Sequence, residues 1–268
     1  MKHSLFAGIL LSTIALSFAA GGVGCSSDDT LVGGGGPDGS TADVRADQAA
    51  PDTGTDTGTL DAGQDAGERC SAAKEQVLTP IDSVSKGEVS VYATEGNAQS
   101  IYVDASAGGP TAAKQNPRIY LKLASNKVTV TDRSAAGSTE WDVALKRDVI
   151  FTNSGDGGKG QGSAVFLADK PFADVTAADA QGKAFAAENF FNDDCTPKRD
   201  DFGSVQTTFT GWYNYNDATH QLTPKAGTWI VRTTAGSFFK LQILSYYSTP
   251  DGGTGIPGGF YTLKVEAL

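Results

Sequence analysis

The residues best suited to hold a ligand lie in the stretch GWYNYNDATH, residues 211–220. It contains Trp212, Tyr213 and Tyr215, and it ends at His220, the only histidine beyond the first few residues of the chain. Imidazole and phenol groups ligate iron, and aromatic rings form the walls of sites for flat organic ligands. The pattern is equally typical of a strand with two tyrosines on one face, followed by a turn-rich linker. We predict a strand that runs into such a linker, and ligand binding by these four side chains is the hypothesis to test.

Groups for catalysis are scarce. A serine nucleophile would need a base, and beyond the signal-like N-terminus the sequence offers His220 as its one histidine and no G-x-S-x-G motif. The acid pairs at 193–194 and 200–201 are adjacent residues in turn-like segments, whereas acid/base catalysis needs two carboxyl groups that face one substrate. The glycine-rich segment 153–164 lacks the Lys-Ser or Lys-Thr of a phosphate-binding loop and precedes another strand pattern, so it is predicted to be a hairpin loop. The sequence therefore indicates a protein that is not an enzyme.

The N-terminus has the features of an export signal. A lysine at position 2 precedes an apolar stretch over residues 5–20, which is shorter than the roughly twenty residues of a membrane-spanning helix. The small residues before Cys25 resemble the lipobox of bacterial lipoproteins, although a leucine is usual where Gly22 stands. We predict a signal peptide over 1–24, acylation of Cys25 and placement in the outer membrane with the protein exposed at the cell surface. The alternative is an ordinary secreted protein in which Cys25 is a spare thiol.

Two further cysteines, Cys70 and Cys195, complete the set of three. An even number of remaining cysteines in an exported chain favours a disulfide. By chain-entropy reasoning, such a bridge would raise the free energy of unfolding by on the order of 4 kcal/mol at most. Structural zinc is the alternative, but two cysteines and one histidine lack a fourth ligand and the close paired spacing. We predict a Cys70–Cys195 disulfide and no metal site other than iron of a bound haem at His220.

A composition change divides the chain after the signal. Residues 25–69 are mostly Gly, Asp, Thr, Ala and Ser, with ten acids against two arginines, and they are predicted to be a disordered, acidic tether. Residues 70–268 hold eighteen basic and twenty-one acidic residues and enough apolar residues to form one domain with a core. The acidic balance and the absence of a basic stripe exclude nucleic acid as a favoured partner.

The domain that must position the candidate residues is predicted to be all-β, with at most short helices. Its strand patterns are short, rich in Val, Ile, Tyr and Phe, and bounded by turn residues; they cover residues 88–93, 99–105, 118–124, 126–131, 141–153, 163–169 and 260–268. Two apolar runs joined at Ala235-Gly236 predict a β-hairpin over 227–247. Only residues 172–190 have a partly helical pattern, which Gly182 interrupts.

Several of these blocks together resemble the HmuY family of bacterial surface lipoproteins. They are WDVALKRDVIFTNSG with the glycine-rich loop after it, GWYNYN, TWIVRTTAGSFFKLQILSYY and the closing GFYTLKVEAL. The resemblance runs from about Glu88 to the C-terminus. It implies a mainly antiparallel β domain, a lipid anchor in the outer membrane and, in the best-known members, capture of haem between two axial histidines or methionines.

This chain departs from that ligand pattern, because its mature part has one histidine, His220, and no methionine. The resemblance therefore transfers no axial ligand to a numbered position. Haem could bind through His220 with a tyrosine or water opposite, and Tyr213, Tyr215, Tyr246 and Tyr247 are the candidate phenols. Trp212 and Trp229 are the candidate aromatic walls.

Two functions from different classes remain open. The first is a non-catalytic, lipid-anchored surface protein that binds haem or a porphyrin. The alternative is an adhesion or envelope-interaction module on the same β scaffold without haem binding. An axial ligand and a haemin-dependent change in absorption distinguish the first from the second.

Overall fold

Antiparallel strands are the main regular structure of the chain in the computed structural model, which describes residues 70–123, 126–255 and 257–268. All of these residues belong to one compact unit, Gly58–Leu268. The predicted all-β class with short helices is confirmed. The predicted signal peptide, Cys25 and the tether lie outside the described residues. No helix in the described part of the chain is both long and apolar enough to cross a bilayer.

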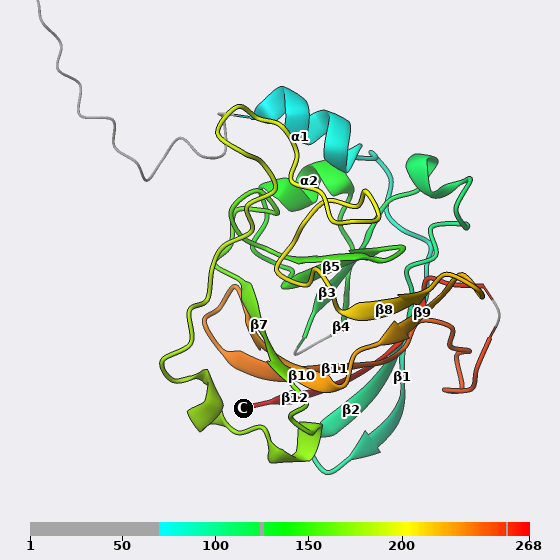
Figure 1. Cartoon of the computed structure of the whole chain (residues 1–268), viewed down its shortest axis with the longest axis vertical. Coiled ribbons are helices and arrows are strands. Elements are labelled where there is room, and N and C mark those ends of the chain that lie inside the picture. The colour runs from blue at the N-terminus through cyan, green and yellow to red at the C-terminus, as the bar shows by residue number, and fades with distance from the viewer. Residues whose placement is uncertain (1–69, 124–125, 256) are drawn as a thin grey trace, which may run out of the picture. The chain divides into compact units, whose positions relative to one another are not determined.

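Three sheets contain the strands (Figure 1). The six-stranded sheet has the order β1-β2-β12-β11-β10-β7, the four-stranded sheet has the order β4-β3-β5-β6, and β8 pairs only with β9. The bounds are β1 Val89–Glu95, β2 Ala98–Asp104, β3 Ile119–Lys122, β4 Asn126–Val128, β5 Val143–Lys146, β6 Val149–Thr152, β7 Ser163–Ala168, β8 Tyr213–Asn216, β9 Gln221–Pro224, β10 Gly227–Arg232, β11 Phe238–Ser245 and β12 Phe260–Ala267.

The largest core lies between the six-stranded and four-stranded sheets. Apolar side chains from β2, β10, β11 and β12 meet those of β3, β5 and β6 there. The C-terminal strand β12 sits between β2 and β11, so it joins the first hairpin to the predicted hairpin β10–β11. That hairpin is confirmed, with Gly236 at a φ of 84° in its turn. Side chains on these strands alternate between buried and more exposed positions, which is why the alternating sequence pattern predicted the strands.

One sequence expectation about regular structure was wrong, and another was right only in part. The pattern over 141–153 is two strands, because Arg147 takes a left-handed backbone with a φ of 53° and reverses the chain between β5 and β6. The segment 172–190 contains only two 3₁₀ turns, Phe172–Asp174 and Ala177–Ala180. Its apolar side chains pack singly against β10 and β11, and this packing overrides the helix propensity of its alanines.

The α-helices lie elsewhere, as α1 Ser71–Leu78 and α2 Asp132–Ala136. Thr131 begins α2 with a capping box in which its side chain accepts from the Ser134 N–H, so β4 ends before the predicted residue 131. A third 3₁₀ turn, Ala113–Gln115, precedes β3. These helices are too short to alter the all-β class.

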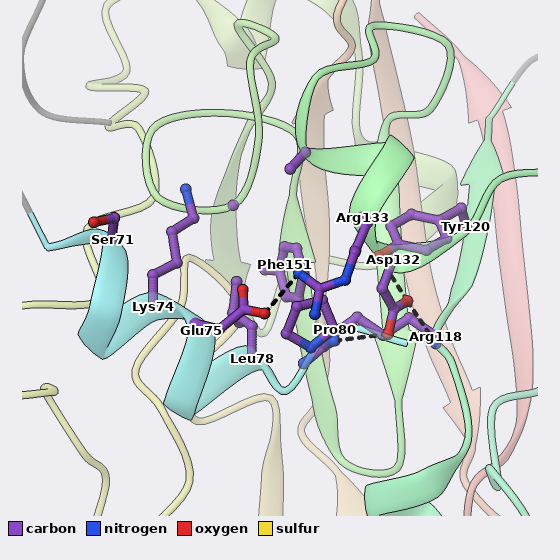
Figure 2. A pocket seen from close by; sticks show the side chains of 12 residues that line it. Ser71, Lys74, Glu75, Leu78, Pro80, Arg118, Tyr120, Asp132, Arg133 and Phe151 are labelled. Atoms are coloured by element: carbon purple, nitrogen blue, oxygen red, sulfur yellow. Dashed lines mark hydrogen bonds and ion pairs between the residues drawn. The ribbon is translucent and has the colours of Figure 1, made fainter. Parts of the chain in front are cut away.

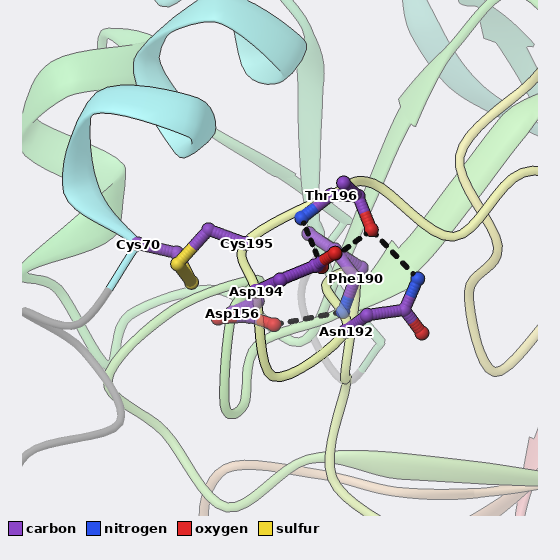
Figure 3. The surroundings of a disulfide bond; sticks show 7 residues. All are labelled: Cys70, Asp156, Phe190, Asn192, Asp194, Cys195 and Thr196. Atoms are coloured by element: carbon purple, nitrogen blue, oxygen red, sulfur yellow. Dashed lines mark hydrogen bonds between the residues drawn. A yellow bond between two sulfur atoms is a disulfide. The ribbon is translucent and has the colours of Figure 1, made fainter.

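The predicted disulfide is present and joins the start of α1 to the loop at Cys195 (Figure 3). The two Cα atoms are 5.4 Å apart, and Cys70 is buried in a second core with Trp141, Phe151 and Phe190. The loop is also held by Asp156, whose carboxylate accepts from the Phe190 N–H at 2.7 Å. The bridge therefore fixes the N-terminal edge of the domain to a packed part of it.

Candidate ligand-binding site

The predicted ligand residues gather around one cavity of about 670 Å³, which we call the aromatic cavity. It lies between the β8–β9 hairpin, the end of β11 and the turn between β5 and β6. Its ring-bearing and apolar lining residues are Phe202, Tyr213, Tyr215, His220, Leu222, Tyr246 and Tyr247. Three of the four residues singled out from the stretch 211–220 therefore share one hollow, together with the two tyrosines that directly follow β11.

The β8–β9 hairpin positions His220. We expected only a turn-rich linker after β8, but Gln221–Pro224 forms β9 and pairs back on it, with Tyr215 opposite Leu222. The Asn216 side-chain oxygen accepts from the N–H groups of Ala218 and Thr219, and the Asn216 backbone carbonyl accepts from the His220 N–H at 2.7 Å. His220 takes a φ of 55°, so the turn geometry and not core packing sets the direction of its ring.

Tyr215 and His220 form a pair on this hairpin. The Tyr215 Oη and His220 Nδ1 are 2.6 Å apart. In the tautomer with a proton on Nδ1, the imidazole donates to the phenol oxygen and its Nε2 presents a lone pair. Nε2 has no hydrogen bond to any residue that the structure describes. A histidine held in this way is oriented as metal-ligating histidines are, through the ring nitrogen that does not bind the metal.

Two tyrosines of the cavity, Tyr213 and Tyr246, are buried. Burial raises the pKa of Tyr213 and of Tyr246, and the nearby Asp148 carboxylate raises both further. Arg147, whose guanidinium carbon is 6.0 Å from the Tyr246 ring, acts in the opposite direction on Tyr246. Both phenols are therefore neutral near pH 7, which suits them to be walls or hydrogen-bond donors more than phenolate ligands.

Phe202 is a wall that the sequence reasoning missed. It is 57% exposed, yet its ring lies 5.1 Å from the Tyr215 ring and 5.8 Å from the Tyr213 ring. A large exposed aromatic side chain in a turn is unusual unless it contacts something. Its place in the acidic turn KRDDFG was the available signal, but the spacing could not show that this turn returns to β8.

The two tryptophans do not line the cavity. Trp212 is 3% exposed and lies beneath it, with its ring centre 4.8 Å from that of Tyr213 and its Nε1 donating to the Asp148 carbonyl at 2.8 Å. Trp229 is buried between Phe166 and Phe209 in the main core. Trp212 thus supports a wall of the cavity, and Trp229 stabilises the sheet.

A smaller hollow of about 330 Å³ lies between α1 and α2 (Figure 2). Its carboxylates are matched by arginines: Asp132 pairs with Arg118, and Glu75 pairs with Arg133 at 2.6 Å. Asp132 also accepts from the Tyr120 hydroxyl at 3.0 Å. These pairs match each carboxylate with a cation and connect the helices to β3, so we assign this hollow a structural role.

The comparisons place the chain among known proteins. A family model described as HmuY protein matches residues 114–258. Among solved structures, a proposed HmuY-like heme-binding protein of Bacteroides vulgatus shares 16% identity, over 67% of this chain and 97% of that one, with a TM-score of 0.45. The apo HmuY analogue of Tannerella forsythia shares 15% identity, over 70% of this chain and 99% of that one, with a TM-score of 0.39.

A third solved structure, a proposed lipoprotein of Bacteroides fragilis, shares 15% identity, over 66% of this chain and 92% of that one, with a TM-score of 0.40. The chain matches no curated protein.

Proposed function

The chain belongs to the HmuY family, and from this premise we propose that it is a lipid-anchored surface protein that binds haem or a porphyrin in the aromatic cavity without catalysis. The observation that carries the proposal is the Tyr215–His220 pair at the edge of a cavity walled by aromatic rings. The anchor at Cys25 and the outer-membrane location rest on the N-terminal sequence.

The residues present fit such a ligand. A volume of about 670 Å³ lies within the range of pockets that hold small organic molecules. Phe202, Tyr213 and Tyr247 offer ring surfaces for a flat macrocycle, and His220 offers an imidazole nitrogen for its iron. When bound, haem would supply the iron that His220 ligates.

Only one nitrogen ligand is available in the described part of the cavity. No group of three or more His, Cys, Asp or Glu residues that could hold a free metal ion occurs among the described residues. The neutral phenols of Tyr213 and Tyr246 are weak competitors for iron, and the Tyr215 hydroxyl is engaged by His220 Nδ1, so His220 would be the residue that holds the iron. Such a site would differ from one with two strong ligands.

A haemin titration of the chain from residue 25, with Cys25→Ser to prevent acylation, tests the proposal. We expect a shifted Soret band at saturation for this parent protein. His220→Asn should remove or strongly change the band, and asparagine is the better replacement because it tolerates the positive φ of this turn. Tyr213→Phe keeps the ring and serves as the matched wall variant, in which the band should persist.

Tyr215→Phe separates orientation from ligation. It removes the partner of His220 Nδ1 while keeping the ring, so we expect weaker haemin binding with the same spectral type. An unchanged Soret band in His220→Asn would show that His220 is only a turn residue. No haemin binding by the parent protein would favour the adhesion or envelope-interaction function on an intact scaffold.

A further inference from the structure

A second cavity adjoins the aromatic cavity on the other side of the β5–β6 turn, and we call it the basic cavity. It has a volume of about 240 Å³. Among its described lining residues five are cationic, namely Lys114, Arg118, Lys146, Arg147 and Arg199, and Asp148 is the only acid. The domain as a whole has slightly more acidic than basic residues, so this concentration of positive charge is local.

Two donors of the basic cavity are buried without a partner. The Lys146 Nζ and the Arg118 Nε make no hydrogen bond within the described residues. Arg118 is only 7% exposed, and its Nη1 already contacts Asp132 at 3.3 Å, which leaves the Nε unsatisfied. A buried donor without an acceptor is unfavourable, so an arriving oxyanion would gain from pairing with both groups.

The remaining cations of the basic cavity differ from Arg118, because they lack a carboxylate partner among the described residues. None of Lys114, Arg147 and Arg199 forms an ion pair with a residue in the described ranges. Arg147 and Arg199 each donate to one backbone carbonyl, those of Gly258 and Gly203. Their guanidinium groups retain further donors, and guanidinium matches the planar geometry of a carboxylate.

The two cavities share a wall. Arg147, Asp148 and Ser204 line both of them. The Ser204 hydroxyl donates to the Asp148 carboxylate at 3.0 Å, which occupies one of its oxygens. One molecule can therefore contact aromatic rings on one side of this wall and positive charge on the other.

We propose that the basic cavity binds a carboxylate arm of the flat ligand whose ring system lies in the aromatic cavity. This inference rests on the proposed function and extends it, because it makes the acidic edge of the ligand a recognition element. Lys146 and Arg118 are the central contacts, and Lys114 and Arg199 lie at the exposed rim. A ligand with the same ring system and no free carboxylate should lose these contacts.

Haemin and its dimethyl ester, titrated in the same detergent, test this directly. The ester keeps the ring and the iron and removes both negative charges. We expect the parent protein to bind haemin at least ten-fold more tightly than the ester. Lys146→Met should weaken haemin binding about ten-fold and leave ester binding unchanged. Lys183→Met, which removes an exposed lysine outside both cavities, should match the parent for both compounds.

The outcomes distinguish failure of the carboxylate subsite from failure of the proposed function. Equal affinity for haemin and ester, or equal weakening of both by Lys146→Met, would overturn the carboxylate subsite while the proposed function stands. If the parent protein binds neither compound, the proposed function fails, and calorimetric titrations with acetate and inorganic phosphate follow. If the parent protein binds acetate or phosphate and Lys146→Met does not, the basic cavity is a site for free anions. If the parent protein binds neither anion, the cavity is not an anion site. Both outcomes overturn the carboxylate-arm proposal.

Discussion

Replacing Lys146 by methionine should stabilise the folded protein. The side chain ends β5, and its Nζ is shielded from solvent with no hydrogen-bond partner in the described chain. Methionine has a similar length and no charge, so it keeps the packing of the aliphatic part and removes the buried ammonium. The expected gain is the desolvation cost that Lys146 imposes on the fold.

The magnitude follows from the pKa of Lys146. Burial, followed by repulsion from Arg118, lowers this pKa from 10.5 to about 8, while Asp132 acts in the opposite direction. A pKa difference of this size means that the charged Lys146 side chain destabilises the folded state by about 3.4 kcal/mol at neutral pH. Because Lys146 is partly exposed, solvent screening reduces the value, and we expect Lys146→Met to raise the free energy of unfolding by about 1–2 kcal/mol.

The gain should depend on pH with a definite sign. The unfolded chain holds a proton on Lys146 up to about pH 10.5, whereas the folded chain loses it near pH 8. Between these values the unfolded state binds more protons, so the wild type becomes more stable relative to the variant as pH rises. The advantage of Lys146→Met is therefore complete below pH 8 and shrinks toward zero as pH approaches 10.5.

Urea unfolding in a buffer free of phosphate and carboxylates measures both effects. The wild type, Lys146→Met and the charge-matched Lys183→Met are compared at pH 7 and pH 10, so that other titrating groups cancel in the difference. Lys183 is exposed, and its replacement should change stability by less than about 0.5 kcal/mol. A destabilised Lys146→Met protein, or a gain that does not change with pH, would refute the assignment of Lys146 as a buried, unpaired cation.

Three further predictions concern the stability and the anchoring of the chain. The Cys25→Ser protein, denatured without reduction, should show no free thiol, and two titratable thiols would contradict the disulfide. Replacing both Cys70 and Cys195 by serine should lower the free energy of unfolding by about 2–4 kcal/mol without loss of the fold. Glu188→Ala should lower the free energy of unfolding by about 3 kcal/mol or more, because the buried Glu188 carboxylate accepts four hydrogen bonds from two threonines. The control Glu140→Ala, at an exposed glutamate, should have little effect. Similar losses for the two variants in urea unfolding would be inconsistent with this role of Glu188. Native protein should fractionate with membranes and Cys25→Ser should not, and equal fractionation would exclude an acyl anchor at that residue.

The sheets were predictable because their strands alternate between core and solvent. The pattern around Phe239, Leu241 and Ile243 indicated the β10–β11 hairpin directly. The helices were not predictable in the same way. None of the α1 residues is buried, so its sequence has no strong apolar stripe, and its position follows from the disulfide at Cys70. Local propensity carries little weight in such short elements.

The candidate site was predictable where its residues are close in sequence. Tyr215 and His220 are five residues apart, and the β8–β9 hairpin brings their side chains together. Phe202 and Lys146 reach the two cavities through long-range folding, from a loop after the disulfide and from the end of β5. No local pattern encodes such distances, because they depend on how the two larger sheets pack.

The residues that carry the family resemblance act on the fold. The Asp142 carboxylate accepts from the Leu123 N–H at 3.1 Å and from the Thr234 N–H at 2.9 Å, so it ties the four-stranded sheet to the β10–β11 turn. Trp141 beside it is fully buried. These side chains lie outside both cavities, so a chain can keep them and the family fold while its ligand residues change. Beyond the predicted signal peptide the chain has a single histidine, so tests at His220, Tyr215 and Lys146 are needed where family membership gives no assignment.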